Sequence, residues 1–378
     1  MHVEGFRRLK DFHLKLAPFT VMIGANGVGK TSVLDAWNLL ARSARGELAQ
    51  SLSDLHGVNA MRSGGSAETI RFRSSMAVDN HQPISYDLTL SMQGAGYDIR
   101  REELSQVQHG PNTTPFFFLK ANGSIVRYND PKTKHLKKPD WDMKPDQSAL
   151  SQVPPMYKEP ERCRKALASS TFYHALDVSP RAPVRLPQPM RPADLPGQNG
   201  EDLVSCLFNL QQSDPDRFEA VEDALRAGFP GFAGLNFPPV AAGMLALTWR
   251  DKNFRQPLYT HQLSEGTLRF LWLATLLQSP GLTEVTLIDE PEVSLHPELL
   301  GLLVELLREA SGRTQVIVAT HADRLVRFLT PVEVVAFDID EDGWTKATRG
   351  DELDLDRWLS EYTLDQLWGM GEMGGRSL

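Results

Sequence analysis

The chain has 378 residues and a formal net charge of −8, with 41% hydrophobic and 23% charged residues. This composition is that of a globular protein and excludes a disordered or fibrous chain. Two cysteines, Cys163 and Cys206, are too few for a disulfide scaffold and favour a reducing compartment. The apolar stretches 240–247 and 270–277 are too short to cross a bilayer, and the first residues contain no apolar signal segment. We therefore expect a soluble cytoplasmic protein.

The charge is unevenly distributed along the chain. Residues 1–170 carry 23 basic and 17 acidic side chains, whereas residues 171–378 carry 17 basic and 31 acidic ones. An acidic average argues against a nucleic-acid partner, but binding depends on local patches and not on totals. The composition therefore leaves such a partner open.

The first half of the chain predicts one strand–helix unit followed by antiparallel sheet. An apolar strand at 19–23 precedes a helix at 31–42. Short alternating runs within 68–101 favour antiparallel strands, and the Asn-Gly turn at 121–124 favours a hairpin. Helices are expected at 162–176 and 201–227, and six prolines between residues 179 and 197 predict an extended loop. The later elements are predicted as strands at 245–250, 285–288 and 315–320, helices at 267–278 and 298–310, and a hairpin of 332–337 with 344–348.

Residues 24–31 match the phosphate-loop pattern G-x-x-x-x-G-K-[ST] and lie between the predicted strand and helix. Glycines let backbone N–H groups surround phosphate oxygens, and the helix N-terminus adds the positive end of its dipole. We expect Lys30 to reach the β- and γ-phosphates of ATP and the Thr31 hydroxyl to hold Mg²⁺. The expected ATP-binding residues of this loop are Gly24, Ala25, Asn26, Gly27, Val28, Gly29, Lys30, Thr31 and Ser32.

Two later strands end in polar residues. Asp289 and Glu290 follow the strand at 285–288, and His321 follows the strand at 315–320. Because the carboxyl ends of parallel strands face the ligand, we expect Asp289 to bind Mg²⁺ and Glu290 to orient or deprotonate the attacking water. His321 can hydrogen-bond the γ-phosphate or that water. Lys30, Glu290 and His321 are thus the expected catalytic residues; the simpler alternative is that these polar residues only end a strand.

The sequence LSEGT at 263–267 precedes a strongly apolar helix. Ser264 suits the N-cap of that helix, which is the simpler interpretation. The functional interpretation is a second phosphate-binding helix N-terminus, formed with Gly266. Two such ends in one chain are useful if the second serves the nucleotide held by another copy.

The order of the phosphate loop, LSEGT, LIDEPE, SLHP and VIVATH resembles the ABC-type ATPase heads of the SMC and RecF class. More closely, it resembles the soluble bacterial AAA family ATPases related to RecF and the OLD proteins, and the tail at 368–375 is similar to the end of that family. The resemblance implies an α/β P-loop NTPase of the ABC/SMC-head type, with a central, mostly parallel sheet, an antiparallel β region and a helical lid insertion. It implies ATP and Mg²⁺ as cofactors.

The resemblance further implies that two heads sandwich two ATP molecules as an ATP-dependent homodimer. Ser264 and Gly266 would then cap the γ-phosphate of ATP on the opposite subunit, and residues 294–297 would lie at the interface. Arg7 and Arg8 resemble a basic pair that approaches the nucleotide. The glutamine that senses γ-phosphate in the wider class cannot be placed, since Gln50, Gln82 and Gln93 all lie in the expected region.

We expect three regions along the chain. Residues 1–45 and 240–378 would form a composite head core, 46–145 an antiparallel β region, and 146–239 a helical lid with the proline-rich loop. The segment between the phosphate loop and LSEGT looks globular and lacks a coiled coil, so the lid is expected to be compact.

A basic segment follows the predicted hairpin, and its members are Lys132, Lys134, His135, Lys137 and Lys138. Further basic residues follow at 162–165 and in the proline loop. Contacts of this kind with nucleic-acid phosphates would be sequence-independent and salt-sensitive; the alternative is a solvated loop.

Three functions remain open. The first is a DNA-linked ATPase switch in repair or genome maintenance. The second is the regulatory ATPase of a phage-defence system that holds a toxin or nuclease effector. The third is the nucleotide-binding subunit of a transporter, which the large insertion and the LSEGT signature disfavour. Asp338 and Asp340 superficially resemble a Toprim metal pair, but we expect them to end a hairpin strand.

Overall fold

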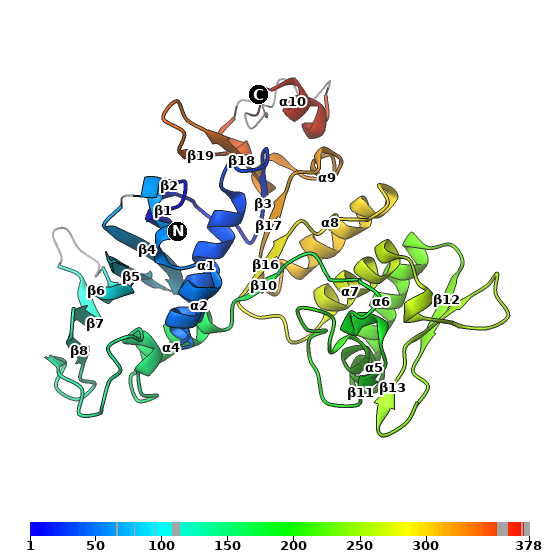
Figure 1. Cartoon of the computed structure of the whole chain (residues 1–378), viewed down its shortest axis with the longest axis horizontal. Helices are drawn as coiled ribbons and strands as arrows, with labels where there is room; N and C mark the ends of the chain where they lie inside the picture. Colours follow the sequence, from blue (N-terminus) through cyan, green and yellow to red (C-terminus); the bar gives the residue numbers. More distant parts are fainter. Residues whose placement is uncertain are drawn as a thin grey trace.

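The computed structural model describes residues 1–65, 67–78, 80–94, 96–107, 114–353, 362–371 and 373. Figure 1 shows a six-stranded sheet in the middle of the molecule, an eight-stranded sheet to one side and a group of helices to the other. The central sheet has the order β10–β16–β17–β3–β18–β19. Its strands are β10 (Thr171–Tyr173), β16 (Val285–Asp289), β17 (Gln315–Thr320), β3 (Phe19–Ile23), β18 (Val334–Ile339) and β19 (Thr345–Arg349).

The first five of these strands pair in parallel, and β19 adds an antiparallel edge. All residues of β3 are buried, as expected for a parallel strand covered on both faces. Alternate residues of β3 point to opposite faces: Val21 and Ile23 belong to one hydrophobic core, and Met22 belongs to the other. The expected α/β fold with a mostly parallel central sheet is confirmed.

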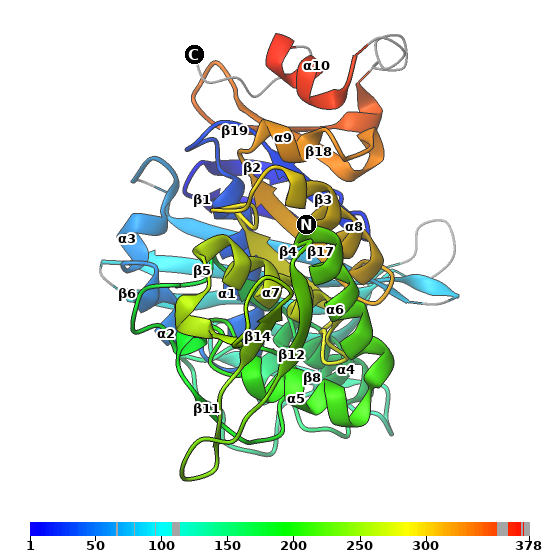
Figure 2. The same cartoon turned by 90° about the vertical axis from the view of Figure 1, so that its right-hand side faces the viewer.

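The core that contains Val21 lies under four helices, which Figure 2 shows in front of the central sheet. They are α5 (Leu203–Ser213), α6 (Pro215–Gly228), α7 (Glu265–Gln278) and α8 (Glu298–Ala310). Short strands complete this side: β11 (Gln188–Pro189) pairs with β13 (Met244–Leu245), and β14 (Thr248–Asp251) pairs with β12 (Phe232–Asn236) and β15 (Leu258–Tyr259).

The core that contains Met22 lies between the central sheet and the eight-stranded sheet. The eight-stranded sheet consists of β1 (His2–Phe6), β2 (Leu9–His13), β4 (Thr69–Val78), β5 (His81–Gln93), β6 (Gly96–Gln106), β7 (Phe116–Asn122), β8 (Ile125–Asn129) and β9 (Leu136–Lys137). The helices on this side are α1 (Lys30–Ala44), α2 (Leu48–Asp54), α3 (Val58–Met61) and α4 (Lys158–Ala168). Near the C-terminus lie α9 (Asp323–Val326) and α10 (Leu364–Met370).

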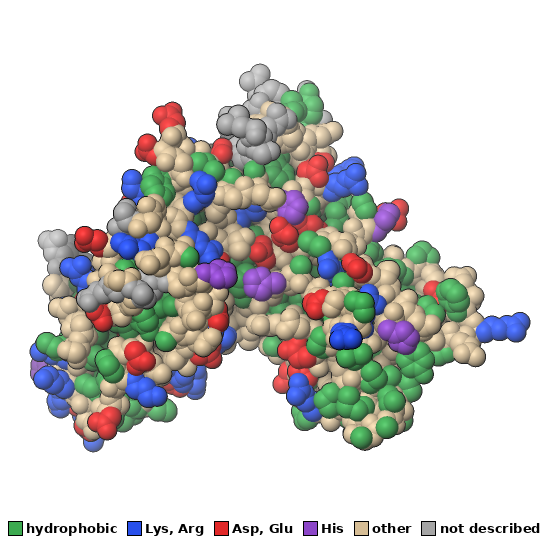
Figure 3. Space-filling model, in the orientation of Figure 1, with side chains coloured by type: hydrophobic (Ala, Val, Ile, Leu, Met, Phe, Trp, Pro, Cys, Tyr) green, Lys and Arg blue, Asp and Glu red, His purple; other side chains and the backbone are tan. Residues whose placement is uncertain are grey.

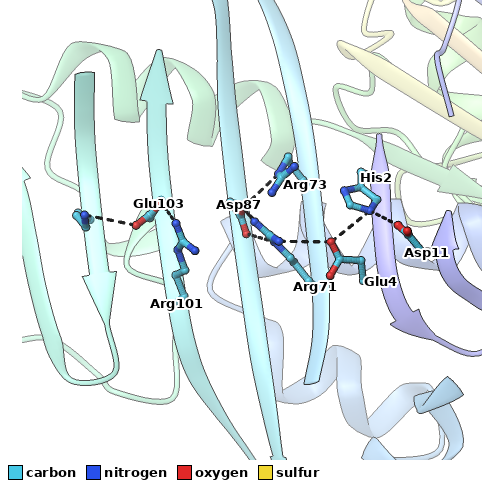
Figure 4. A network of polar contacts seen from close by, with 9 residues as sticks. His2, Glu4, Asp11, Arg71, Arg73, Asp87, Arg101 and Glu103 are labelled. Carbon is cyan, nitrogen blue, oxygen red and sulfur yellow. Dashed lines mark hydrogen bonds and ion pairs between the residues drawn. The ribbon is translucent and has the colours of Figure 1, made fainter. Parts of the chain in front are cut away.

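A row of charged residues crosses one face of the eight-stranded sheet (Figure 4). Arg71 on β4 donates to Asp87 on β5 at 2.6 Å and lies 3.4 Å from Glu4 on β1. Arg73 adds a 3.2 Å contact to Asp87. These pairs connect three strands, and the charges of Arg71 and Arg73 are engaged within the sheet.

Three expected elements differ from the structure. The helix expected at 162–176 ends with α4, because Thr171, Phe172 and Tyr173 are β-branched and aromatic residues that pair with β16. The helix expected at 201–227 is two helices, since Pro215 begins α6 and Asp214 caps it by accepting from Arg217 N. The strand expected at 245–250 is divided between β13 and β14, and β13 pairs inside the proline-rich loop.

The division of the chain into head core, β region and lid remains a proposal. The expected head core and β region share one sheet, because β1 pairs with β4.

Both cysteines are free and buried, and burial raises the pKa of the Cys163 thiol to about 12. Within the part of the chain that the structure describes, no helix is long and apolar enough to cross a membrane.

Candidate functional site

The phosphate loop turns between β3 and α1 through three glycines with positive φ: Gly24 at 150°, Gly27 at 80° and Gly29 at 109°. L-residues rarely adopt these conformations, which explains the glycines. Lys30 begins α1 and its Nζ donates to Gly24 O at 2.6 Å and to Ala25 O at 2.8 Å. Its ammonium group therefore lies across the loop that is expected to hold phosphate.

The predicted catalytic residues meet at one edge of the central sheet. Because β16, β17 and β3 are parallel neighbours, the residues that follow them lie side by side. Thr31 Oγ1 donates to Asp289 Oδ2 at 3.3 Å, and His321 Nδ1 lies 3.0 Å from Glu290 Oε1. Figure 3 shows acidic and histidine side chains in the middle of the molecule. They lie above a hollow between the lobe that contains the eight-stranded sheet and the lobe that contains the helices.

Two carboxylates and one lysine carry the charges at this edge. Burial raises the pKa of Asp289, and the neighbouring Glu290 raises it further. Burial lowers the pKa of Lys30, although the charges of Asp289 and Glu290 oppose that effect. A carboxylate next to a hydroxyl supplies the hard oxygen ligands that Mg²⁺ prefers, so Thr31 and Asp289 fit that ion.

Glu292 is a buried carboxylate that the sequence analysis did not single out. It is 9% exposed, and its Oε1 accepts from Thr320 Oγ1 at 2.5 Å. Thr320 Oγ1 in turn accepts from Ala322 N at 3.0 Å, so the pair holds the backbone on both sides of His321. The third acidic residue of the run Asp-Glu-Pro-Glu was the available signal. Glu292 therefore stabilises the turn that carries His321.

His174 is a second missed residue, and the wrongly predicted helix at 162–176 concealed it. Strand β10 pairs with β16 so that Tyr173 lies opposite Ile288, which places His174 at the same sheet edge as Asp289. Its charge lowers the pKa of Asp289, partly offsetting the effect of burial. The position beside Asp289 is therefore held by a histidine.

The three glutamines that the sequence analysis left open lie elsewhere. Gln50 is on α2, where its side chain donates to Asp54 at 2.8 Å. Gln82 and Gln93 are on β5 of the eight-stranded sheet. None of them follows a strand of the central sheet.

The LSEGT segment is not joined to the phosphate loop of its own chain. Ser264 is exposed and caps α7, accepting from Thr267 N at 3.2 Å. A Cβ on Gly266 would lie 2.5 Å from Ser294 O, so α7 packs closely against the turn at 293–295. Arg269 strengthens this contact by donating to Val293 O at 3.1 Å. Across the described residues, no recorded hydrogen bond or ion pair links Ser264 or Gly266 to residues 24–32.

Some side chains of the basic segment and the proline-rich loop make contacts within the protein, and others extend into solvent. Lys137 is held by Asp130 at 2.8 Å, whereas Lys132, Lys134 and Lys138 extend from an exposed segment. Figure 3 shows basic side chains on the outer rim of the lobe that carries β8. In the proline-rich loop Arg185 is used structurally, since it donates to the carbonyl oxygens of Val178, Thr260, His261 and Leu263.

Arg7 and Arg8, the basic pair near the N-terminus, both make contacts within the protein. Arg7 Nη1 contacts Asp35 of α1 at 2.5 Å, and Arg8 Nη1 donates to Gly343 O at 3.0 Å. Among the described residues, His2, Asp11 and His13 also have donor atoms within 4.8 Å of one another. The two imidazole rings stack at 3.7 Å and 14°, so their lone pairs run side by side and do not converge on one ion.

The fold is that of SMC head domains. The structure is similar to the Smc head bound to the C-winged helix domain of ScpA, with a TM-score of 0.54 and 14% identity over 92% of this chain and 96% of that chain. The chain belongs to the family described as AAA domain, putative AbiEii toxin, Type IV TA system, whose profile matches residues 19–327. The resemblance drawn from the sequence motifs is confirmed.

Two curated relatives are similar in sequence. One is the Retron Ec83 probable ATPase of Escherichia coli, 24% identical over 387 aligned positions that cover 86% of this chain and 68% of that protein. The other is the Septu protein PtuA of Bacillus thuringiensis, 27% identical over 88 positions, which cover 23% of this chain and 22% of that protein.

Proposed function

We propose that this protein binds ATP with Mg²⁺ at residues 24–32 and hydrolyses it. The observation that carries the proposal is the meeting of Lys30, Asp289, Glu290 and His321 at one sheet edge, with His321 3.0 Å from Glu290. Lys30 would turn from the loop carbonyls to the β- and γ-phosphates, and Thr31 and Asp289 would hold Mg²⁺. Glu290, held by His321, would orient the attacking water and accept its proton.

We further propose that ATP joins two copies into a homodimer. Ser264 caps an exposed helix N-terminus that has no recorded bond to the phosphate loop of its own chain. A helix N-terminus of this kind attracts anions, so it can bind the γ-phosphate held by a second copy. The turn at 293–295, packed against Gly266, would lie at the same interface. Hydrolysis would release the two copies and thereby make the protein a switch.

Among the open biological roles, we propose the ATPase of a defence system that controls a toxin or nuclease effector. The family description names a putative toxin, and the relatives come from a retron and from Septu. A nucleic-acid partner is a second candidate, because Lys132, Lys134 and Lys138 are exposed and form no ion pair with the other residues that the structure describes. Repair or genome maintenance would use the same basic segment.

The proposed function is tested with Glu290→Gln and Lys30→Ala. Glu290→Gln should bind ATP, hydrolyse it about 10²- to 10⁴-fold more slowly and accumulate as a dimer in light scattering. Lys30→Ala should bind no ATP and stay monomeric. The ATP-loaded Glu290→Gln protein, purified from its host, would show by mass spectrometry and nuclease digestion whether protein or nucleic acid accompanies it. Wild-type turnover by Glu290→Gln would refute the assigned base.

A further inference from the structure

The β18–β19 hairpin, which is near the C-terminal end of the chain, lies against the phosphate loop. Thr345, the first residue of β19, donates its hydroxyl to Val28 O at 2.8 Å, a contact between residues 317 positions apart. A Cβ placed on Gly29 would collide with the Thr345 side chain, and one placed on Gly24 would lie 2.6 Å from Phe337 O of β18. Two loop glycines are therefore required by this hairpin as well as by their positive φ.

The direction of the Val28 carbonyl has a consequence for phosphate binding. In a trans peptide the C=O and the following N–H point in opposite directions, and no cis peptide is recorded among the described residues. Since Val28 C=O points to Thr345, the Gly29 N–H points away from the hairpin. Loops of this kind bind phosphate through backbone N–H groups, and the direction of the Val28–Gly29 peptide sets the direction of one of them.

Thr345 is itself fixed in place by the turn between β1 and β2. Its backbone N donates to Arg8 O at 3.1 Å, and Arg8 Nη1 donates to Gly343 O at 3.0 Å. The same turn is tied to α1 by the contact between Arg7 and Asp35. The hydroxyl is thus held against Val28 by residues on three separate segments.

We propose that Thr345 is a positioning residue that orients the Val28–Gly29 peptide for phosphate. Without its hydroxyl, Val28 O loses its recorded donor and the peptide can rotate, which turns the Gly29 N–H away from the ligand. The proposal rests on the proposed binding of ATP at this loop. It predicts that the hydroxyl of a residue far along the chain determines ATP affinity without contacting ATP.

The test compares Thr345→Val, which keeps the shape and removes the hydroxyl, with Thr345→Ser, which keeps the hydroxyl. Thr348→Val on the same strand is the matched control, because Thr348 lies opposite Ala336 of β18 and, among the described residues, makes no side-chain hydrogen bond to the loop. The dissociation constant of a fluorescent ATP analogue with Mg²⁺ is measured for each, together with the ligand-free melting temperature and kcat at saturating ATP. Thr345→Val should bind about five- to tenfold more weakly, with a smaller change in kcat.

Thr345→Ser and Thr348→Val should bind within about twofold of the wild type, well below the effect of one lost hydrogen bond. Arg8→Ala, which loosens the hairpin but keeps the hydroxyl, should weaken binding less than Thr345→Val does and serves if the valine variant folds poorly. Equal affinity of Thr345→Val and wild type, or equal impairment of Thr345→Ser, would overturn the inference. A wild-type protein that binds no ATP would instead refute the proposed function.

Discussion

His321 and Glu290 lie on neighbouring parallel strand ends, with Nδ1 of the histidine 3.0 Å from Oε1 of the glutamate. Glu290 has an unusual φ of 50°, and its backbone N donates to Ala319 O on β17 at 2.8 Å. This bond holds the backbone of Glu290 against β17, whose end carries His321. The two residues are 31 positions apart in the sequence and are brought together by the pairing of β16 with β17.

We expect His321→Ala to lower kcat about 10²-fold with little effect on ATP affinity, because Glu290 loses the group that orients it. His321→Asn should recover part of the loss, since an Asn amide can donate from nearly the position of Nδ1. Steady-state hydrolysis and ATP titration separate the two effects. Equal turnover of wild type and His321→Ala would show that Glu290 acts without the histidine.

His174 is expected to support the Mg²⁺ site from the other side of Asp289. His174→Ala should raise the Mg²⁺ concentration needed for half-maximal hydrolysis, whereas His174→Gln should stay closer to wild type because it can still hydrogen-bond a bound water. Magnesium titrations of ATP hydrolysis provide the measurement. His135→Ala, a change at an exposed histidine of the basic segment, is the control and should leave the titration unchanged.

Ser264 allows the helix cap and the phosphate contact to be tested separately. Ser264→Ala should destabilise the protein by about 1 kcal/mol through loss of the cap. Ser264→Asn and Ser264→Asp should both keep the cap, but the aspartate would repel the γ-phosphate of the second copy. We expect ATP-dependent dimers of Glu290→Gln to form with asparagine and to be lost with aspartate in light scattering. Dimers that form equally with both would exclude this contact.

The pair of Arg71 and Asp87 predicts a pH dependence of stability. Burial raises the pKa of Asp87, but the hydrogen bonds and charge of Arg71 outweigh this, so the pKa lies below its ordinary value of 3.8. The stability from this carboxylate is therefore present above pH 3.8 and is lost as the pH falls through the lower folded pKa. Asp87→Asn should lower the free energy of unfolding by about 2 kcal/mol at pH 7.

That difference between Asp87→Asn and wild type should shrink as the pH is lowered from 4 to 2. Urea unfolding at several pH values measures it. Asp98→Asn, on the exposed side of neighbouring β6, should match the wild type throughout. A destabilisation of Asp87→Asn that is the same at pH 7 and pH 2 would mean that packing and not charge is responsible.

The basic segment predicts a salt-dependent interaction with nucleic acid. Changing Lys132, Lys134 and Lys138 together to glutamine should reduce the slope of log affinity against log salt by about 0.9 per lost phosphate contact on duplex DNA. Lys137→Gln is the control, since Asp130 already holds Lys137. Fluorescence anisotropy over a salt series gives the slopes. Identical slopes for the triple variant and the wild type would leave the protein effector as the remaining partner.

Three features could be predicted from the sequence alone: the phosphate loop, the acidic strand end and the helix cap at Ser264. Each depends on neighbours within a few residues: positive φ at glycines, an apolar strand before a carboxylate, and a serine three residues before Thr267. Features that depend only on neighbouring residues can be predicted without knowledge of the fold. The order of these motifs along the chain was also enough to predict the parallel sheet and the ATPase class.

The residues that reach this site from distant parts of the chain could be recognised only in the folded protein. His174 is brought there by a three-residue strand, and strand pairing with β16 outweighed the local helical pattern. Glu292 is joined to Thr320, and Thr345 is joined to Val28, each through one hydrogen bond between a strand and a turn or loop elsewhere in the chain. Such contacts depend on the order and register of the strands, which a short stretch of sequence does not specify. They add residues to a site for which the motifs supplied the first members.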